Sequence, residues 1–320
     1  MNTGVKITAF AAALAATFGT AYGVGKGVGP VDEPKKAEHA GHAAQDPQKA
    51  SGHEGHEEGA PASAAALPGG LQISQDGYTL ALETPTPAVG RSTLKFSIKD
   101  ATGRKVTAFT TEHGKELHFI VASRDLDTFR HLHPVKAADG TWSVDADLPT
   151  AGGYKAFADF KPAAPGAEGV TLGADLSVPG AYAPKPLPAV ASTATVDGYQ
   201  VRLAGVLDPG KAGELKLTVT KGGKPVTDLE PYLGAYGHLV ALRDGDLAYL
   251  HVHPNEGGPG PDVSFTAEAP SAGTYRLFLD FQHEGKVRTA SFTVKAGATG
   301  KAAAEPAGAA THDAGGHTHG

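Results

Sequence analysis

The chain contains an internal repeat, which constrains its fold more than any other feature. The first unit opens with D-G-Y-T-L-A-L (Asp76–Leu82) and closes with A-G-G-Y-K-A-F-A-D-F (Ala151–Phe160). The second opens with D-G-Y-Q-V-R-L (Asp197–Leu203) and closes with A-G-T-Y-R-L-F-L-D-F (Ala272–Phe281). Units of roughly 105 residues are large enough to bury a core of their own. The repeat therefore predicts two copies of one domain in tandem.

Short runs of alternating polarity fill both units. Examples are T-L-K-F-S-I-K (Thr93–Lys99) and E-L-K-L-T-V-T (Glu214–Thr220), and turn sequences such as K-G-G-K-P separate the runs. Alternation with a period of two is typical of β-strands that bury one face. We therefore expect an all-β protein made of two tandem immunoglobulin- or cupredoxin-like β-sandwiches.

Composition divides the rest of the chain. The segments that flank the repeats are rich in Gly, Ala, Glu and His and hold few large apolar side chains, so we expect them to be disordered. Four prolines between Pro179 and Pro188 predict a semi-rigid joint. The expected segments are a signal or anchor helix at 1–26, a His-rich linker at 27–66, the first repeat at 67–179, the joint at 180–190, the second repeat at 191–295 and a His-rich tail at 296–320.

An apolar run at residues 7–25 follows Lys6 and predicts export from the cytoplasm. Its length is close to the ~18–20 residues that span a bilayer, which favours an uncleaved N-terminal membrane helix. Gly19-Thr20-Ala21 is a weak cleavage sequence, so a cleaved signal and a secreted protein form the alternative. In both cases we expect the repeats to lie outside the cytoplasm. The expected partners are the membrane and an envelope protein.

The amino-acid composition limits the kinds of metal and redox site that the chain can form. Cys is absent and the only Met is Met1, whereas the chain holds 15 His. These counts exclude disulfides, thiolate zinc sites, iron–sulfur clusters and blue-copper sites. The net charge of −6 argues against nucleic acid as a partner.

Each unit carries the pattern H-x12-H-x-H-P. The histidines are His118, His131 and His133 in the first unit and His238, His251 and His253 in the second. A two-residue turn at Asp244-Gly245 would pair His238 with His251, and the same register would pair His118 with His131. Because opposed residues and residues two apart share a face, the three rings of a unit should cluster. Apolar residues should face the sandwich core instead: Phe119, Val121 and Leu132 in the first unit, and Leu239, Ala241, Leu250 and Val252 in the second.

Three neutral imidazoles form a site for a divalent transition metal such as Cu(II), Zn or Ni. Asp159 and Asp280 recur in the closing motifs, and each could be a fourth ligand or a partner that orients a ring. A purely structural role for these histidines and aspartates is the alternative. H-x-x-H and H-T-H in the flanking segments resemble loose metal-binding tracts. Metal binding should weaken as the pH falls through about 6.5, because protons compete for the ring nitrogens.

Residues 67–295, with their A-G-x-Y motifs and H-x-H-P triplets, resemble bacterial exported or anchored tandem immunoglobulin-like domains, such as the YtkA-like and other copper-handling proteins. The resemblance implies metal binding or sensing rather than a known reaction. Cu(I) transfer is not expected, because the Met-rich motifs of several such families are missing.

Three functions remain open from the sequence. The leading hypothesis is a non-enzymatic protein that binds a divalent metal. The second is an immunoglobulin-like structural or adhesive module, with Tyr232 and Tyr236 as first contact candidates. The third is a zinc-dependent hydrolase in which Glu112 or Glu116 would be the general base, although no G-x-S-x-G or H-E-x-x-H motif is present.

Overall fold

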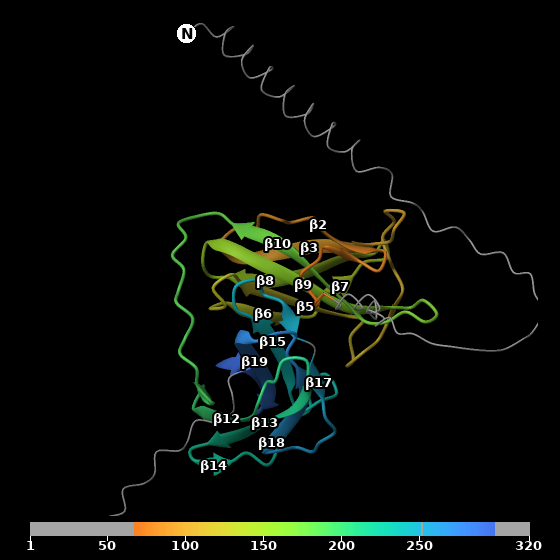
Figure 1. Ribbon diagram of the computed structural model, residues 1–320. Helices are drawn as coiled ribbons and strands as arrows, with labels where there is room; N and C mark the ends of the chain where they lie inside the picture. Colours follow the sequence, from red (N-terminus) through yellow and green to blue (C-terminus); the bar gives the residue numbers. More distant parts are fainter. Residues whose placement is uncertain (1–66, 251, 298–320) are drawn as a thin grey trace, which may run out of the picture. The chain divides into compact units, whose positions relative to one another are not determined.

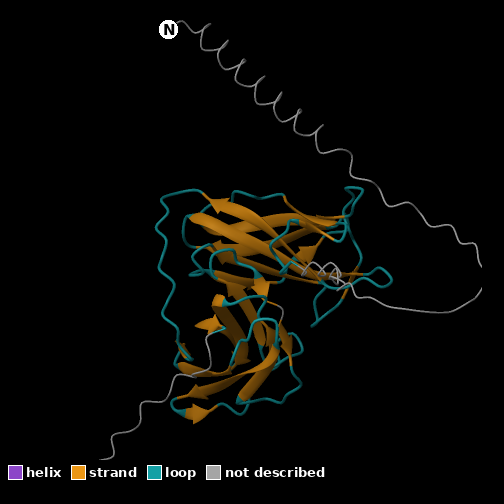
Figure 2. Ribbon diagram, in the orientation of Figure 1, coloured by secondary structure: helices purple, strands orange, loops and turns teal. Residues whose placement is uncertain are grey.

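The computed structural model describes residues 67–250 and 252–297, with the backbone alone at His253. These residues form strands and loops (Figure 2), which confirms the predicted all-β class. In this part of the chain, no helix is long and apolar enough to cross a membrane. The predicted anchor at 1–26, the linker at 27–66 and nearly all of the tail lie outside the described residues.

The first repeat is a sandwich of two antiparallel sheets (Figure 1). One has the order β1-β2-β3-β8-β7, and the other has the order β10-β9-β5-β6 with β4 also paired to β9. The strands are β1 (Ser74–Gln75), β2 (Tyr78–Leu82), β3 (Gly90–Lys99), β4 (Phe109–Thr110), β5 (Leu117–Ser123), β6 (Phe129–Leu132), β7 (Val135–Lys136), β8 (Thr141–Leu148), β9 (Gly152–Pro162) and β10 (Val170–Val178).

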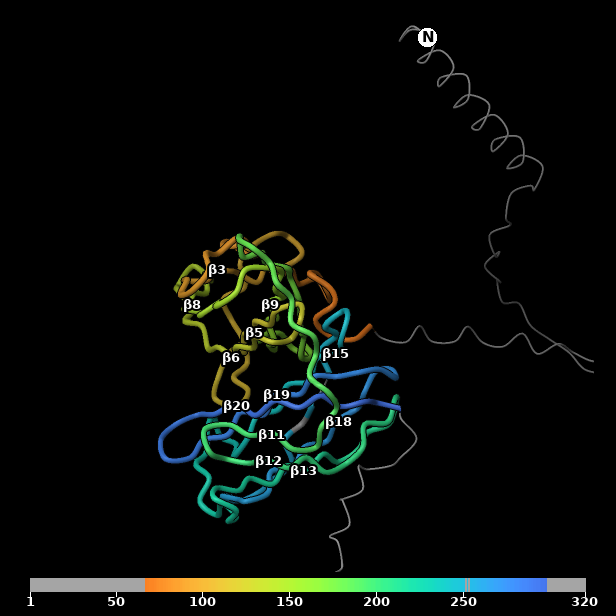
Figure 3. The backbone as a smooth tube through the Cα atoms, turned by 90° about the vertical axis from the view of Figure 1, so that its left-hand side faces the viewer, coloured from red at the N-terminus to blue at the C-terminus, as the bar shows by residue number. Residues whose placement is uncertain are grey.

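The second repeat has the same architecture. Its sheets are β11-β12-β13-β18-β17, with β14 paired to β13, and β16-β15-β19-β20. Figure 3 shows β11, β12 and β13 side by side. The strands are β11 (Thr193–Val196), β12 (Tyr199–Gly205), β13 (Ala212–Lys221), β14 (Lys224–Pro225), β15 (His238–Arg243), β16 (Tyr249–Leu250), β17 (Val252–Pro254), β18 (Asp262–Glu268), β19 (Gly273–His283) and β20 (Lys286–Ala296).

Each sandwich has its own apolar core, and both include the residues that alternation placed there. Phe119 and Val121 are fully buried in the first core, where the Phe96 ring stacks on Phe119 with 4.1 Å between centroids. Leu239 and Ala241 are buried in the second core. The predicted inward-facing residues are therefore confirmed in both units.

The repeated A-G-x-Y motif closes each sandwich through a tyrosine. The Tyr154 hydroxyl donates to the Thr150 carbonyl at 2.8 Å, and the Tyr275 hydroxyl donates to the Ser271 carbonyl at 2.9 Å. Both rings are almost completely buried. A tyrosine that bonds the backbone a few residues upstream is a hallmark of immunoglobulin-like sandwiches. The motif thus fixes a corner of the fold in each repeat.

The register predicted for the His-bearing hairpins is wrong by two residues. His131 lies opposite Ile120 rather than His118, and Ala241 lies opposite Leu250. In the first hairpin, a four-residue loop at 124–127 joins the strands, and the backbone N–H of Ser123 bonds the Thr128 carbonyl. The loop is wider than a two-residue turn because its leucine is buried. A displacement of two residues keeps every side chain on its original face.

A third apolar cluster lies between the two repeats. It covers the faces of sheets β10-β9-β5-β6 and β16-β15-β19-β20 that point away from their own cores. It contains Ile120 and Phe157 from the first repeat with Val240 and Phe278 from the second. The turn leucines Leu126 and Leu247, which have φ values of 57° and 60°, are completely buried in it. In this cluster, Phe129 stacks on Phe278 at 4.0 Å and Phe157 lies 5.7 Å from Tyr249, and both pairs join the two repeats. Both repeats belong to one compact unit. The face that carries the histidines therefore packs against the other repeat.

Candidate metal centre

Three histidines of the first repeat come together at the edge of this inter-repeat cluster. His118 lies on β5, His131 lies on β6, and His133 follows β6 directly. Pro134 lacks a backbone N–H and stands where the chain leaves β6 for β7 in the other sheet. One ring nitrogen of each histidine lies within 4.8 Å of those of the other two. The H-x-H-P pattern thus places its rings at a strand end.

Hydrogen bonds assign the tautomers of two of these rings. His131 Nδ1 lies 2.9 Å from Asp280 Oδ2, and both side chains are only 6 % exposed. His118 Nε2 lies 3.4 Å from the Glu112 carbonyl oxygen. Because a carboxylate and a carbonyl only accept, these two nitrogens carry the protons. The other two, His118 Nδ1 and His131 Nε2, face each other at 3.1 Å.

Two bare ring nitrogens at this distance repel each other unless a proton or a cation lies between them. Zn–N bonds of about 2.0–2.1 Å place the nitrogens of a tetrahedral site about 3.3–3.4 Å apart. The 3.1 Å between His118 Nδ1 and His131 Nε2 is close to that spacing. The 4.8 Å outer limit of the trio exceeds it, so closure around an ion requires a small ring movement.

The third ring, His133, offers a nitrogen without a partner. Its Nδ1 lies 3.3 Å from the Tyr232 hydroxyl of the second repeat. Its Nε2 is buried and has no hydrogen-bond partner among the residues that the structure describes. A buried nitrogen left unpaired costs free energy, which a bound metal ion would recover.

Two further histidines stand next to the trio. His238 donates from Nε2 to the Tyr232 carbonyl at 2.7 Å, and its ring lies 5.9 Å from that of His131. The His113 ring lies 6.3 Å from that of His118 and 6.0 Å from that of His238. Neither belongs to the group whose nitrogens converge within 4.8 Å. By contrast, His283 bonds Tyr199 and Asp228.

The remaining candidate ligands have other positions. Asp280 lies opposite His238 in the sheet, accepts from Thr289 Oγ1 and orients His131. Asp159 lies opposite His118 and accepts from Thr171 Oγ1 at 2.9 Å. His251 and the side chain of His253 lie outside the described residues. A second metal site within the second repeat stays a prediction, as does the role of every ligand named from the sequence.

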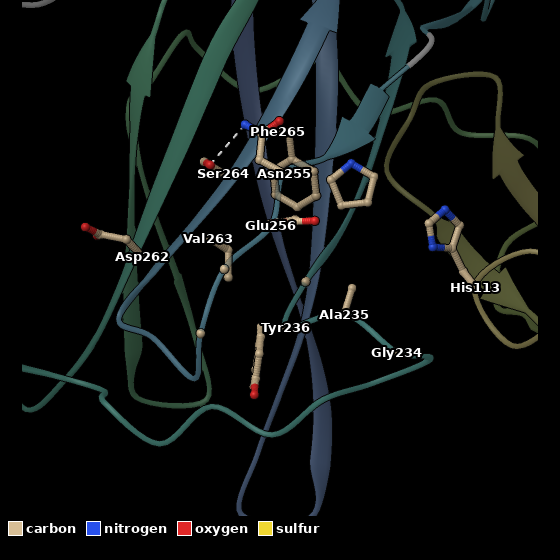
Figure 4. Close-up of a pocket in the computed structure, with 14 residues that line it drawn as sticks. His113, Gly234, Ala235, Tyr236, Asn255, Glu256, Asp262, Val263, Ser264 and Phe265 are labelled. Carbon is tan, nitrogen blue, oxygen red and sulfur yellow. Dashed lines mark hydrogen bonds between the residues drawn. The ribbon is translucent and has the colours of Figure 1, made fainter.

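Two neighbouring cavities lie near the trio, and the smaller one is lined by two of its rings. A small one is lined by His113, His118, His131 and His238. The larger one, about 430 Å³, is lined by His113 and by residues of the second repeat that include Glu256 and Asp262. Figure 4 shows His113 on one side of this larger cavity and Asn255, Glu256 and Phe265 on the other. His113 lines both cavities, so the larger cavity and its acidic side chains lie next to the small one.

Burial favours the neutral form of His118, His133 and His238. Burial, followed by the nearby His131, lowers the pKa of His118 from 6.5 to about 4. Burial, followed by His131 and His118, lowers the pKa of His133 to about 3. Burial also lowers the pKa of His238. Neutral imidazoles are the form that binds metals.

We expect the metal-free protein to lose stability as the pH falls from about 6.5 toward 4. His118 and His133 titrate near 6.5 in the unfolded chain, but at about 4 and about 3 in the folded protein. The unfolded state therefore binds more protons in this window, so acid favours unfolding. Thermal unfolding at a series of pH values measures the loss. His133→Gln should reduce the pH dependence, and an unchanged slope in that variant would contradict the assignment.

The inter-repeat contacts were not foreseen from the sequence. The orienting role of Asp280 toward His131 spans 149 positions, and the contact of Tyr232 with His133 spans 99. Tyr232 was singled out only as a surface contact. The repeated D-F motif is the sequence signal for Asp280, and it does not indicate which ring the carboxylate contacts.

A family model matches residues 73–168 and 194–298, which correspond to the two repeats. The chain belongs to the family described as "Domain of unknown function (DUF8832)". This match covers more than half of the chain and shows no YtkA-like or copper-handling family. No curated protein matches the chain.

Solved structures show weak similarity to this member of the family. A DUF4426 family protein from Pseudomonas aeruginosa is 12 % identical, with 32 % of this chain and 91 % of that one covered and a TM-score of 0.24. The adhesin InvE from Yersinia pseudotuberculosis is 12 % identical over 69 % of this chain and 60 % of that one, with a TM-score of 0.22. Domains 5–6 of the S-layer protein SbsC are 13 % identical, with 68 % of this chain and 96 % of that one covered and a TM-score of 0.21. Scores this low carry no argument about function.

Proposed function

We propose that this protein binds a divalent transition metal ion, Cu(II), Zn or Ni, through His118, His131 and His133, outside the cytoplasm. The observation that carries the proposal is the pair of hydrogen bonds from the outer nitrogens of His118 and His131 to Glu112 and Asp280. Metal-binding histidines almost always donate their second N–H to a carboxylate or a carbonyl. Here that arrangement turns two lone pairs toward each other, and the buried Nε2 of the third ring, His133, has no hydrogen-bond partner among the described residues.

The chemistry of the donors supports the metals named. Three imidazoles with no thiolate or thioether suit borderline divalent ions rather than Cu(I). An orienting carboxylate raises the basicity of the ring that it holds. Metal binding requires only these donors and no general base or nucleophile. The proposed function is therefore metal binding rather than catalysis.

Titration of the full chain tests this proposal. The His-rich segments at 27–66 and 296–320 could also take up metal, so the titration is run against a competing chelator that suppresses weak binding. We expect at least one site that holds Zn²⁺ or Cu²⁺ in the presence of the chelator. Loss of all uptake under this competition would overturn the proposal.

A second candidate is an immunoglobulin-like structural or adhesive module. The observation in its favour is the apolar cluster between the repeats, which packs the two sandwiches against each other without any metal. Binding of an envelope protein that a chelator leaves unchanged would support this candidate, and binding lost with the chelator would support the metal proposal.

A further inference from the structure

Two of the three groups that orient the trio belong to the other repeat. Asp280, on β19 of the second repeat, accepts from His131 of the first repeat. Tyr232, also in the second repeat, places its hydroxyl 3.3 Å from His133 Nδ1. Two of the three rings that converge are therefore positioned across the interface. The first repeat supplies the three ligands and orients His118 through the Glu112 carbonyl, whereas the partners of His131 and His133 belong to the second repeat.

The same strands carry the apolar contact between the repeats. Phe278 precedes Asp280 by two positions on β19, and Phe129 precedes His131 by two positions on β6. The two phenyl rings stack with 4.0 Å between centroids and an interplanar angle of 6°. Because residues two apart on a strand share a face, the ring stack and the His131–Asp280 bond form one continuous contact. A movement that separates the rings also withdraws the carboxylate from the imidazole.

We propose that metal binding and docking of the two repeats are coupled, an inference that rests on the proposed function of the trio. The docked arrangement fixes His131 and His133 for the ion, so it binds metal more tightly than an undocked arrangement. By linkage, the ion favours docking by the same factor. A bound ion thus adds to the apolar contact that holds the two repeats together.

Two phenylalanines on one strand give a matched test. Phe278 faces the other repeat, whereas Phe281 faces the core of its own sandwich. Both are buried and both substitutions to Ala should lower stability. The apparent affinity for metal falls by the fraction of molecules that are docked. We therefore expect Phe278→Ala to weaken Zn²⁺ binding at least about tenfold, and Phe281→Ala to change it less than about threefold.

A polar variant keeps the test decisive if Phe278→Ala does not fold. Asp280→Asn retains the size of the side chain but weakens the acceptor for His131, and we expect about 10- to 100-fold weaker Zn²⁺ binding. Asp145→Asn is the control, because Asp145 likewise accepts from a threonine, Thr93, but lies on β8 away from the trio.

Docking itself is measured with two spin labels. The chain has no Cys, so Ala101→Cys and Val206→Cys introduce the only thiols, at exposed positions in different repeats. We expect a broad distance distribution for metal-free Phe278→Ala or Asp280→Asn that narrows when Zn²⁺ is added. Suppose that the wild type binds Zn²⁺ but that the two variants bind it equally well, or that Zn²⁺ leaves the distances unchanged. Either result would overturn the coupling and leave the metal proposal intact. If the wild type holds none, the metal proposal fails with it.

Discussion

Replacement of His131 by Ala is expected to lower the affinity for Zn²⁺ by at least about 100-fold, more than the loss of an orienting partner. His131 is the central ring of the trio, since its Nε2 lies 3.1 Å from His118 and its ring lies 4.8 Å from that of His133. Its removal also leaves the buried Asp280 without its imidazole partner. Competition titration of the full chain measures the change.

The control for this variant is His283→Gln. His283 is also a buried histidine, but its ring bonds Tyr199 and Asp228. Its replacement should cost stability and leave Zn²⁺ affinity within about threefold of the wild type, given the usual additivity of distant sites. Equal losses in the two variants would show that the His131 effect reflects general unfolding and would contradict the proposed site.

Phe157→Ala should destabilise the protein by about 3–5 kcal/mol, although this side chain points away from the core of its own sandwich. Phe157 is completely buried in the inter-repeat cluster and packs against Tyr249. Phe160 lies on the same strand, faces the first core and packs against Phe109, so Phe160→Ala provides a reference of the same type. Chemical denaturation of both variants measures the difference.

Phe157→Ala and Phe160→Ala together distinguish docked repeats from repeats that do not contact each other. If the outer face of β9 were exposed to solvent, Phe157→Ala would change the free energy of unfolding by less than about 0.5 kcal/mol, as surface substitutions do. A cost comparable to that of Phe160→Ala shows that the two repeats share a core. A negligible cost would contradict the docked arrangement and remove the basis for an orienting carboxylate from the second repeat.

Local features of the fold could be predicted because they depend on local pattern. Alternation along β5 correctly assigned Phe119 and Val121 to the core of the first sandwich. The hairpin register could not be predicted as well, because Asp244-Gly245 signals a tight turn whereas Leu247 is drawn into the apolar cluster and widens the loop. Burial of a leucine side chain contributes about 1.5–3 kcal/mol, which is enough to override a local turn preference.

The candidate site could be predicted only in part, for a related reason. The spacing of His118, His131 and His133 brought the rings to one face, and the structure places their nitrogens within 4.8 Å of one another. Asp280 was named as a partner, but the ring that it contacts lies in the other repeat. No spacing rule describes a contact between separate domains, since it depends on how two completed sandwiches pack.

The most direct test of the central claim is X-ray absorption spectroscopy of the full chain loaded with less than one equivalent of Zn²⁺. The account predicts a spectrum with three imidazole nitrogens at about 2.0–2.1 Å. It also predicts that this spectrum is lost when His118, His131 and His133 are replaced together by Ala. An unchanged spectrum in that triple variant would place the ion elsewhere and contradict the account.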